Sequence, residues 1–255
     1  MNALIDRVRS RLSPRGAVQG LWIGEALGPI GQLSIRSFLA HGYRYHLYTY
    51  GKVEGVPAGA TILDAREILP ASRIFKYRDH DSYAGFSNHF RYRLLLLRGG
   101  VWVDCDVICL RRLRLPGFAV AQEESAEGPP QCASCLMAAP KGDELMRQAE
   151  AICDAADVRT LQWGQTGPKL MTRLVRELGR EQSLLPVEAV CPVSFMRWKD
   201  LISPEPAVQA QARELVRPAQ AVHLWHELFR REGFQERVRF PEGSVVAELQ
   251  ARYAS

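Results

Sequence analysis

Two aspartates separated by a single residue are the part of this sequence best suited to chemistry. Asp104 and Asp106 follow an apolar segment that begins at Gly99-Gly100. Charge buried within a strand is destabilising, so the pattern is best explained if the strand ends there and turns. Both carboxylates then reach one hard divalent cation, because Mg²⁺ and Mn²⁺ take oxygen ligands and often bind substrate phosphates as well. The structural alternative is that the acids cap a loop or pair with one of the arginines Arg111, Arg112 and Arg114.

The elements that must position these acids begin with an alternation of strand and helix. Residues 20–24 form a short apolar run that ends at a glycine, which is typical of a buried first strand. The apolar spacing over 30–40 predicts an amphipathic helix, and His41-Gly42 closes it. The aromatic segment 43–50 predicts a second strand. Strand, helix and strand in this order predict a parallel sheet with a right-handed crossover.

The aspartates lie on the next predicted helix and strand. A helix over 87–97 stops at the two glycines, and a strand over 101–109 carries the acids near its middle. The preceding residues 73–90 have little periodicity and predict a loop over the sheet. This alternation predicts one α/β domain with a decorated C-terminal half. The other expected elements are strands at 60–63, 118–121, 135–139 and 221–225, and helices at 64–69, 142–156, 166–179 and 243–253.

Composition and charge limit the class of protein. The chain has 255 residues, of which 47% are hydrophobic and 24% charged, so it can bury a core. These proportions exclude a disordered tail, a coiled coil, collagen and a disulfide-rich peptide. A net charge of +5 and a pI of about 9.0 favour anionic ligands such as nucleotides, phosphates or lipid head groups. We find no nucleic-acid-binding motif and expect no nucleic-acid partner.

Cysteine spacing and the N-terminal segment bear on location. Cys132 and Cys135 form one C-x-x-C pair in a Gly-Pro-Pro-rich region, without a second pair or a nearby histidine to complete a zinc site. We expect the cysteines to be mostly buried and reduced, with a redox role for this pair as a minor alternative.

No apolar stretch has the length of a signal peptide or a membrane span. We therefore predict a cytoplasmic protein, with a basic N-terminus that is able to rest on the inner face of a membrane.

The residues around the aspartates resemble a glycosyltransferase family that carries a D-x-D sugar-binding region. The family pattern S-D-x-x-R-Y … G-G-x-Y-x-D-x-D is matched by Ser87, Arg91 and Tyr92, and then by the two glycines and the two aspartates. Further signatures of the family lie, in the same order, at 21–24, 34–50, 166–168 and 221–225. The resemblance extends over roughly residues 20–232.

The resemblance implies a fold, a reaction and a metal. The fold is a GT-A-like, Rossmann-type mixed sheet with flanking helices, and the reaction is hexosyl transfer that retains the anomeric configuration. Asp104 and Asp106 are implied to hold Mn²⁺ or Mg²⁺ across the two phosphates of the donor, with His223 as a third ligand through a neutral ring nitrogen. The predicted divisions are an N-terminal helix or extension at 1–19, the transferase domain at 20–240 and a C-terminal helix at 241–255.

The resemblance also implies roles for other side chains. Trp22 is implied to stack on the base of the nucleotide, a contact worth roughly 1–3 kcal/mol. Each position also has an ordinary interpretation: Trp22 and His223 as core residues, Arg91 as a surface or ion-pair residue, and Thr166 as a helix N-cap. The expected catalytic group is Asp104, Asp106 and Arg91; the expected donor-binding group is Trp22, Ile23, Asn88, Arg91, Trp102 and Asp104; the expected acceptor side is Gln165 and Thr166.

Two departures from the family pattern bear on the donor. Asn88 stands where much of the family has aspartate, and Trp102 stands where tyrosine is frequent. We expect these changes to affect the choice of donor more than the type of reaction. The predicted function is transfer from a nucleotide sugar, with UDP-sugars favoured, to a saccharide or lipid-linked acceptor in polysaccharide biosynthesis. The alternatives are a metal-dependent nucleotide-sugar phosphohydrolase and a non-catalytic anion-binding module.

Overall fold

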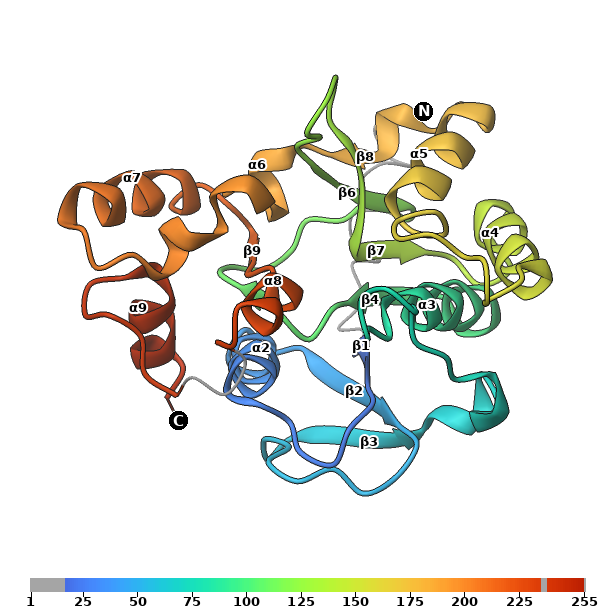
Figure 1. The fold of residues 1–255 in the computed structure, drawn as a ribbon, viewed down its shortest axis with the longest axis horizontal. Helices are drawn as coiled ribbons and strands as arrows, with labels where there is room; N and C mark the ends of the chain where they lie inside the picture. Colours follow the sequence, from blue (N-terminus) through green and yellow to red (C-terminus); the bar gives the residue numbers. More distant parts are fainter. Residues whose placement is uncertain (1–16, 235–237, 255) are drawn as a thin grey trace, which may run out of the picture.

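The computed structural model describes residues 17–234 and 238–254, and a seven-stranded mixed sheet forms its centre (Figure 1). The first four strands in spatial order are parallel, and the remaining strands mix both directions. In spatial order the strands are β3 (Ala60–Asp64), β2 (Arg44–Thr49), β1 (Ala17–Trp22), β4 (Gly100–Val103), β7 (Gln131–Ala139), β6 (Ala119–Glu123) and β8 (Leu184–Leu185).

The predicted strand–helix–strand unit is confirmed. Helix α2 (Pro29–Ala40) connects β1 to its parallel neighbour β2. A proline at the first helical position has a backbone angle already suited to a helix, and the chain turns out of the helix at Gly42, where φ is 78°. Most apolar side chains of α2 are buried, and Ile35 and Phe38 are fully so. The predicted α/β class is therefore confirmed, with a mixed sheet and flanking helices.

Two apolar clusters lie on opposite faces of the sheet. One contains α3 (Ala84–Arg98), α4 (Glu144–Ala155) and α5 (Pro168–Glu177), which Figure 1 shows together on one side of the strands. The other contains α2 together with most of the C-terminal third of the chain, including α9 (Val245–Arg252). The central strands β1 and β4 end between these two layers.

The strand predicted over 101–109 is in fact two strands in two different sheets. β4 ends at Val103, and β5 (Val107–Cys109) instead pairs antiparallel with β9 (Ala221–His223). The three residues between them form the turn that carries both aspartates. Because charge is costly inside a strand, the break occurs where the two acids stand.

Other expected elements differ in extent. The helix expected at 64–69 is a single 3₁₀ turn, and the loop expected over 73–90 ends where α3 begins at Ala84. Residues 17–19 of the expected N-terminal extension belong to β1, and the rest of that segment lies outside the described residues. The remaining elements are η1 (Ala65–Glu67), η2 (Ala71–Arg73), η3 (Glu181–Ser183), α6 (Val187–Val190), η4 (Phe195–Ile202), α7 (Pro206–Val216) and α8 (His226–Arg231).

The cysteines and the helix lengths bear on two further expectations. Five of the six cysteines are buried and all six are free, as expected. Cys132 and Cys135 lie in strand β7 rather than in a loop, and they belong to the apolar clusters on opposite faces of the sheet. The C-x-x-C pair therefore does not form one site. Within the described residues, the helices are too short or too polar to cross a membrane.

Candidate active site

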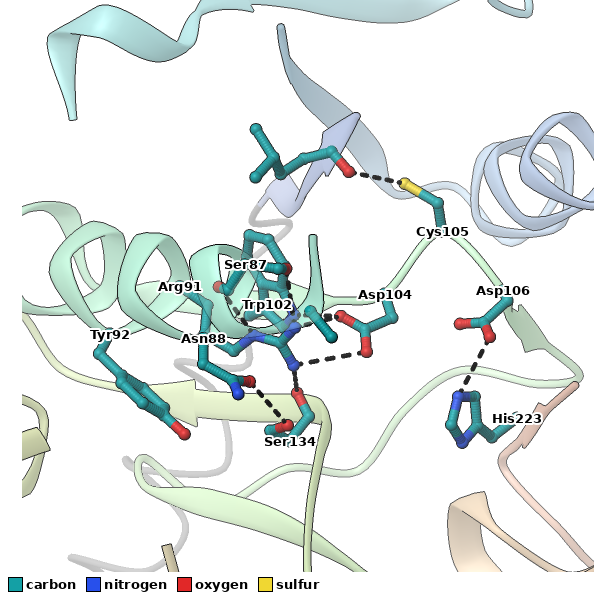
Figure 2. A network of polar contacts seen from close by, with 12 residues as sticks. Ser87, Asn88, Arg91, Tyr92, Trp102, Asp104, Cys105, Asp106, Ser134 and His223 are labelled. Carbon is teal, nitrogen blue, oxygen red and sulfur yellow. Dashed lines mark hydrogen bonds and ion pairs between the residues drawn. The ribbon is translucent and has the colours of Figure 1, made fainter. Parts of the chain in front are cut away.

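The aspartate turn lies between two cavities at the ends of β1 and β4. The backbone N–H of Asp104 donates to Cys135 in β7, and the N–H of Val107 closes the turn on the Asp104 carbonyl. The thiol of Cys105, in the middle of the turn, faces the carbonyl of Leu21 in β1 at 3.5 Å (Figure 2). Both carboxylates and Arg91 line both cavities.

We name the two cavities after the strands that border them. The β7 cavity, of about 560 Å³, is also lined by Asn88, Glu123, Ser134, Trp163 and His223. The β1 cavity, of about 480 Å³, is also lined by Trp22, Ile23, Lys76, Ser87 and Arg230.

Arg91 holds the first aspartate in place. Its guanidinium lies 3.1 Å from Asp104 Oδ1 and donates to the carbonyl of Ser134 and to the hydroxyl of Ser87. The same group lies over the ring of Trp102, 4.9 Å from the ring centroid. Figure 2 shows these side chains converging from α3, β4 and β7. A buried arginine with this many partners is fixed in position, so it serves to orient Asp104.

The indole of Trp102 makes the second contact to Asp104. Its Nε1–H donates to Asp104 Oδ1 over 2.8 Å, and the side chain itself is fully buried in the sheet. Trp102 is not among the residues that line either cavity. The structure therefore places it behind the aspartate, and its expected role toward a donor stays a prediction.

Asp106 is held by the C-terminal part of the chain. Its Oδ2 accepts the backbone N–H of His226 at 2.8 Å and lies 3.2 Å from Nε2 of His223 in β9 (Figure 2). Its own carbonyl accepts the N–H of Leu224. Because β5 pairs with β9, residues more than a hundred positions apart meet at this carboxylate.

The pKa values of the two carboxyl groups are shifted in opposite directions. Burial raises the pKa of Asp104; the Arg91 guanidinium opposes this, the Asp106 charge adds to it, and the pKa stays above its usual range. Burial acts on Asp106 in the same sense, but the charge and hydrogen bond of His223, with the backbone N–H of His226, lower the pKa of Asp106 to about 2. Burial alone would lower the pKa of His223, yet Asp106 raises it well above its usual value. Asp106 and His223 therefore form an ion pair, and His223 would have to give up the proton on Nε2 to bind a cation through that nitrogen.

The residues present fit a hard divalent cation. One ligand atom from each of Asp104, Asp106 and His223 lies within 4.8 Å of the others. A carboxylate has about four lone-pair sites, and donors from Arg91 and Trp102 already occupy most of those on Asp104. Asp106 has more accepting capacity left, and its role as the more direct ligand stays a prediction. The side chains of Asp104 and Asp106 remain 25% and 13% exposed, toward the cavities.

The other expected donor-binding residues fall into two places. Trp22 and Ile23 line the β1 cavity, and the indole N–H of Trp22 donates to the carbonyl of Ala26 at 3.0 Å. Asn88 is buried and lines the β7 cavity, where its Oδ1 accepts from the Ser134 hydroxyl at 3.4 Å. The structure thus brings Trp22 and Ile23 together on one side of the aspartates and Asn88 on the other. Their roles toward a donor stay predictions.

The expected acceptor residues lie apart from the aspartates. Gln165 and Thr166 line a separate cavity of about 300 Å³ beside α5. The carbonyl of Thr166 accepts a hydrogen bond from the Tyr92 hydroxyl. The hydroxyl of Thr166 is buried with no hydrogen-bond partner within the described residues. Their neighbours Gly164 and Pro168 do line the β7 cavity. The loop therefore reaches the cavity through residues other than the two that were predicted.

Sequence reasoning missed several residues of the β7 cavity, among them Glu123 and Trp163. Glu123, at the end of β6, is buried, and burial raises its pKa; Gln131 donates to its Oε1 at 2.9 Å. Trp163 is 39% exposed at the cavity, with Arg231 over its ring at 4.5 Å. The end of a predicted strand next to the site strand was a signal for Glu123. The irregular loop that carries Trp163 gave none.

An α/β sheet that ends at paired carboxylates between two cavities defines an enzyme site, and comparisons with known proteins give its class. A family model described as "Alpha 1,4-glycosyltransferase conserved region" matches residues 155–253. The chain is 28% identical, over 185 residues, to the lactosylceramide 4-alpha-galactosyltransferases of Pongo pygmaeus, Rattus norvegicus and Homo sapiens. The match covers 66% of this chain and 77%, 46% and 47% of those relatives, so the chain spans about half the length of most of them.

Solved structures of glycosyltransferases also match the chain, at lower similarity. PaToxG glycosyltransferase is 16% identical with a TM-score of 0.46, and covers 100% of this chain and 91% of its own. An active-site mutant of LgtC is 9% identical with a TM-score of 0.44, and the match covers 82% of this chain and 87% of the LgtC chain. The family model and the curated relatives confirm the resemblance to a glycosyltransferase family: the chain is a transferase enzyme.

Proposed function

We propose that this enzyme is a metal-dependent, retaining glycosyltransferase that moves a hexose from a nucleotide sugar to a saccharide or lipid-linked acceptor. The observation that carries the proposal is the convergence of Asp104 and Asp106 on the boundary between two cavities, with Arg91 behind them. One cavity on each side of a carboxylate pair suits a reaction in which a diphosphate leaves from one side and an acceptor approaches from the other.

The β1 cavity suits the nucleoside diphosphate part of the donor. Trp22 and Ile23 supply apolar surface for a base, and the cations of Lys76 and Arg230 line the same cavity. Asp81 and Glu227, which pair with these two cations, line the cavity as well, so a divalent cation on the aspartates would be needed to make it favourable for an anionic ligand. A divalent cation held by Asp104 and Asp106 would neutralise the charge that grows on the departing diphosphate.

The β7 cavity suits the sugar and its acceptor. Asn88, Ser134 and Glu123 provide hydrogen-bonding groups in its wall, while Trp163 and Phe195 provide aromatic surface. A pocket with apolar walls and a few convergent polar groups is the usual form of a small-molecule site. Arg91 keeps Asp104 oriented between the two cavities, because its contacts to Ser87 and Ser134 fix its position.

The relatives narrow the choice of substrates. Their names describe galactosyl transfer to lactosylceramide. We therefore propose UDP-galactose as the first donor to test and a lactose-terminated glycolipid as the first acceptor. Retention of configuration rests on the family resemblance, as does a role in polysaccharide biosynthesis. A cytoplasmic location stays a prediction.

The proposal is tested by turnover of UDP-galactose, UDP-glucose and GDP-mannose with Mn²⁺, with and without lactosylceramide or free lactose. We expect Asp104→Asn and Asp106→Asn each to lower kcat/KM by at least about 100-fold, as removal of an electrostatic stabiliser does. Asp157→Asn is the matched control, since Asp157 pairs with Arg159 at the surface, away from both cavities. NMR of the product reports the configuration at the anomeric carbon.

Two outcomes contradict the proposal. Retained activity in both aspartate variants would remove these residues from the reaction. Release of sugar 1-phosphate and nucleoside monophosphate at the same rate with and without acceptor would instead identify a nucleotide-sugar phosphohydrolase.

A further inference from the structure

A second group of potential metal ligands lies directly behind the aspartate turn. Cys135 in β7, Cys191 after α6 and His223 in β9 are all buried, and one ligand atom from each lies within 4.8 Å of the others. The sulfur atoms of the two cysteines are 3.8 Å apart. These three residues come from separate parts of the chain, and the proposed transfer reaction does not use the cysteines.

The spacing of the sulfur atoms matches that of a tetrahedral zinc site. Two Zn–S bonds of about 2.3 Å at the tetrahedral angle place their sulfur atoms about 3.8 Å apart. Two thiolates with an imidazole are soft and borderline donors, which favour zinc over Mg²⁺ or Mn²⁺. Cys135 and His223 also line the β7 cavity, so a fourth position is open to water.

The two nitrogens of His223 are in different situations. Nε2 lies 3.2 Å from Asp106 Oδ2, whereas Nδ1 is buried without a hydrogen-bond partner in the described parts of the chain. A histidine that binds zinc through one nitrogen commonly donates its other N–H to a carboxylate, which fixes the ring. Asp106 already stands in the place of that carboxylate.

We propose that Cys135, Cys191 and His223 form a binding site for a soft divalent cation of the zinc class, distinct from the aspartate pair. Nδ1 of His223 and both sulfur atoms are the protein ligands, and water from the β7 cavity completes the tetrahedron.

The site shares His223 with the aspartate turn, and this has a consequence for the reaction. A cation on Nδ1 keeps the proton on Nε2, where it is donated to Asp106. Nε2 then has no lone pair for a hard cation. Occupation of the cysteine site therefore opposes any use of His223 as a third ligand beside Asp104 and Asp106. Because such coupling is reciprocal, Mn²⁺ and Zn²⁺ weaken each other's binding.

The test uses the full chain, reduced and stripped of metal by a chelator, and titrated with Co²⁺ as a spectroscopic probe for the zinc site. We expect thiolate-to-cobalt charge-transfer absorption in the near ultraviolet, which Zn²⁺ displaces. Cys135→Ala and Cys191→Ala should each lose this absorption and bind Zn²⁺ at least about 100-fold more weakly, more than the loss of an outer-shell partner would cause. Cys153→Ala, a buried free cysteine outside the cluster, should bind as the unmodified chain does.

Several results would overturn the site. One is an unmodified chain that shows no charge-transfer absorption; another is a Cys135–Cys191 disulfide that forms in place of metal binding. Equal loss of absorption in Cys153→Ala would make the effect one of general stability. Asp104→Asn should keep the absorption whether or not it abolishes transferase activity, so failure of this site and failure of the proposed function are distinguishable.

Discussion

Arg91 and Asp104 form a pair in which one partner is fully enclosed and the other faces the site. Arg91 is 4% exposed, and its positive charge is balanced by Asp104 and by the carbonyl of Ser134. Removing one member of a buried pair leaves the other charge uncompensated, which costs more than the pair itself contributes. The pair is thus a structural requirement of the turn as well as a part of the site.

A double-mutant cycle on this pair measures that requirement. We expect Arg91→Ala to lower the free energy of unfolding by about 3 kcal/mol, the low end for a buried pair, because a quarter of the Asp104 side chain is exposed. Adding Asp104→Asn should recover at least about 1 kcal/mol of that loss, since the two residues are in contact. Chemical denaturation of both single variants and the double variant checks this. Additive effects would show that the two side chains act independently.

The aspartates show what residue types alone predict. Their chemistry favoured a turn at 104–106, and the structure has that turn. Trp102 shows the limit of such reasoning: its position in a family pattern placed it beside the donor, whereas its indole N–H points to Asp104 from inside the sheet. Alternation along a strand does not say which neighbour a buried polar atom will find, because that depends on the packing of the whole layer.

At the scale of elements, Gly99, between α3 and β4, determines where helix α3 ends and the site strand starts. Gly99 has φ of 66°, and a Cβ there would lie 2.5 Å from the backbone nitrogen of Lys141. The helix therefore turns directly into the strand that leads to Asp104. A side chain at this point would force the two backbones apart.

Gly99→Ala should consequently destabilise the fold by more than about 2 kcal/mol, from the unfavourable φ together with the overpacking. Gly117→Ala is the matched control, because a Cβ there meets nothing within 4 Å. We expect the control to stay within about 1 kcal/mol of the unmodified chain, toward greater stability. Thermal and denaturant unfolding of the two variants decide the matter, and equal stabilities would contradict the role given to Gly99.

Local elements were more predictable from sequence than their partners. The apolar spacing of α2 and the aromatic run of β2 were sufficient for the strand–helix–strand unit. The pairing of β5 with β9 was not predictable, because no local pattern specifies which distant strand will cover a three-residue strand. The cysteine group was not predictable for the same reason. The C-x-x-C spacing suggested Cys132 as the partner of Cys135, whereas the packing of distant segments places Cys191 beside it.

At the scale of the whole molecule, His89 links the stability of the fold to pH. It is buried on α3, with Nε2 at 3.7 Å from Glu150 and 3.9 Å from Asp154 on α4. Burial lowers the pKa of His89 below its ordinary value of 6.5; Glu150 opposes this and Arg73 adds to it. The folded state therefore binds this proton less readily than the unfolded state does.

The sign of the pH dependence follows from that difference. Above pH 6.5 the ring is neutral in both states, and below it the unfolded state gains the proton first, so the free energy of unfolding falls as pH falls. We expect His89→Gln to flatten this slope between pH 7 and pH 5. Unfolding curves across that range provide the measurement, and identical slopes in both proteins would rule His89 out as the source.

The pairing of β5 with β9 has a consequence for how the site comes into being. Asp106 receives its contacts from His223, Leu224 and His226, which lie more than a hundred residues further along the chain. During synthesis the aspartate turn leaves the ribosome long before these residues exist. The nascent chain thus carries the carboxylates without the strand that holds one of them, and the centre is completed only after more than a hundred further residues have been added.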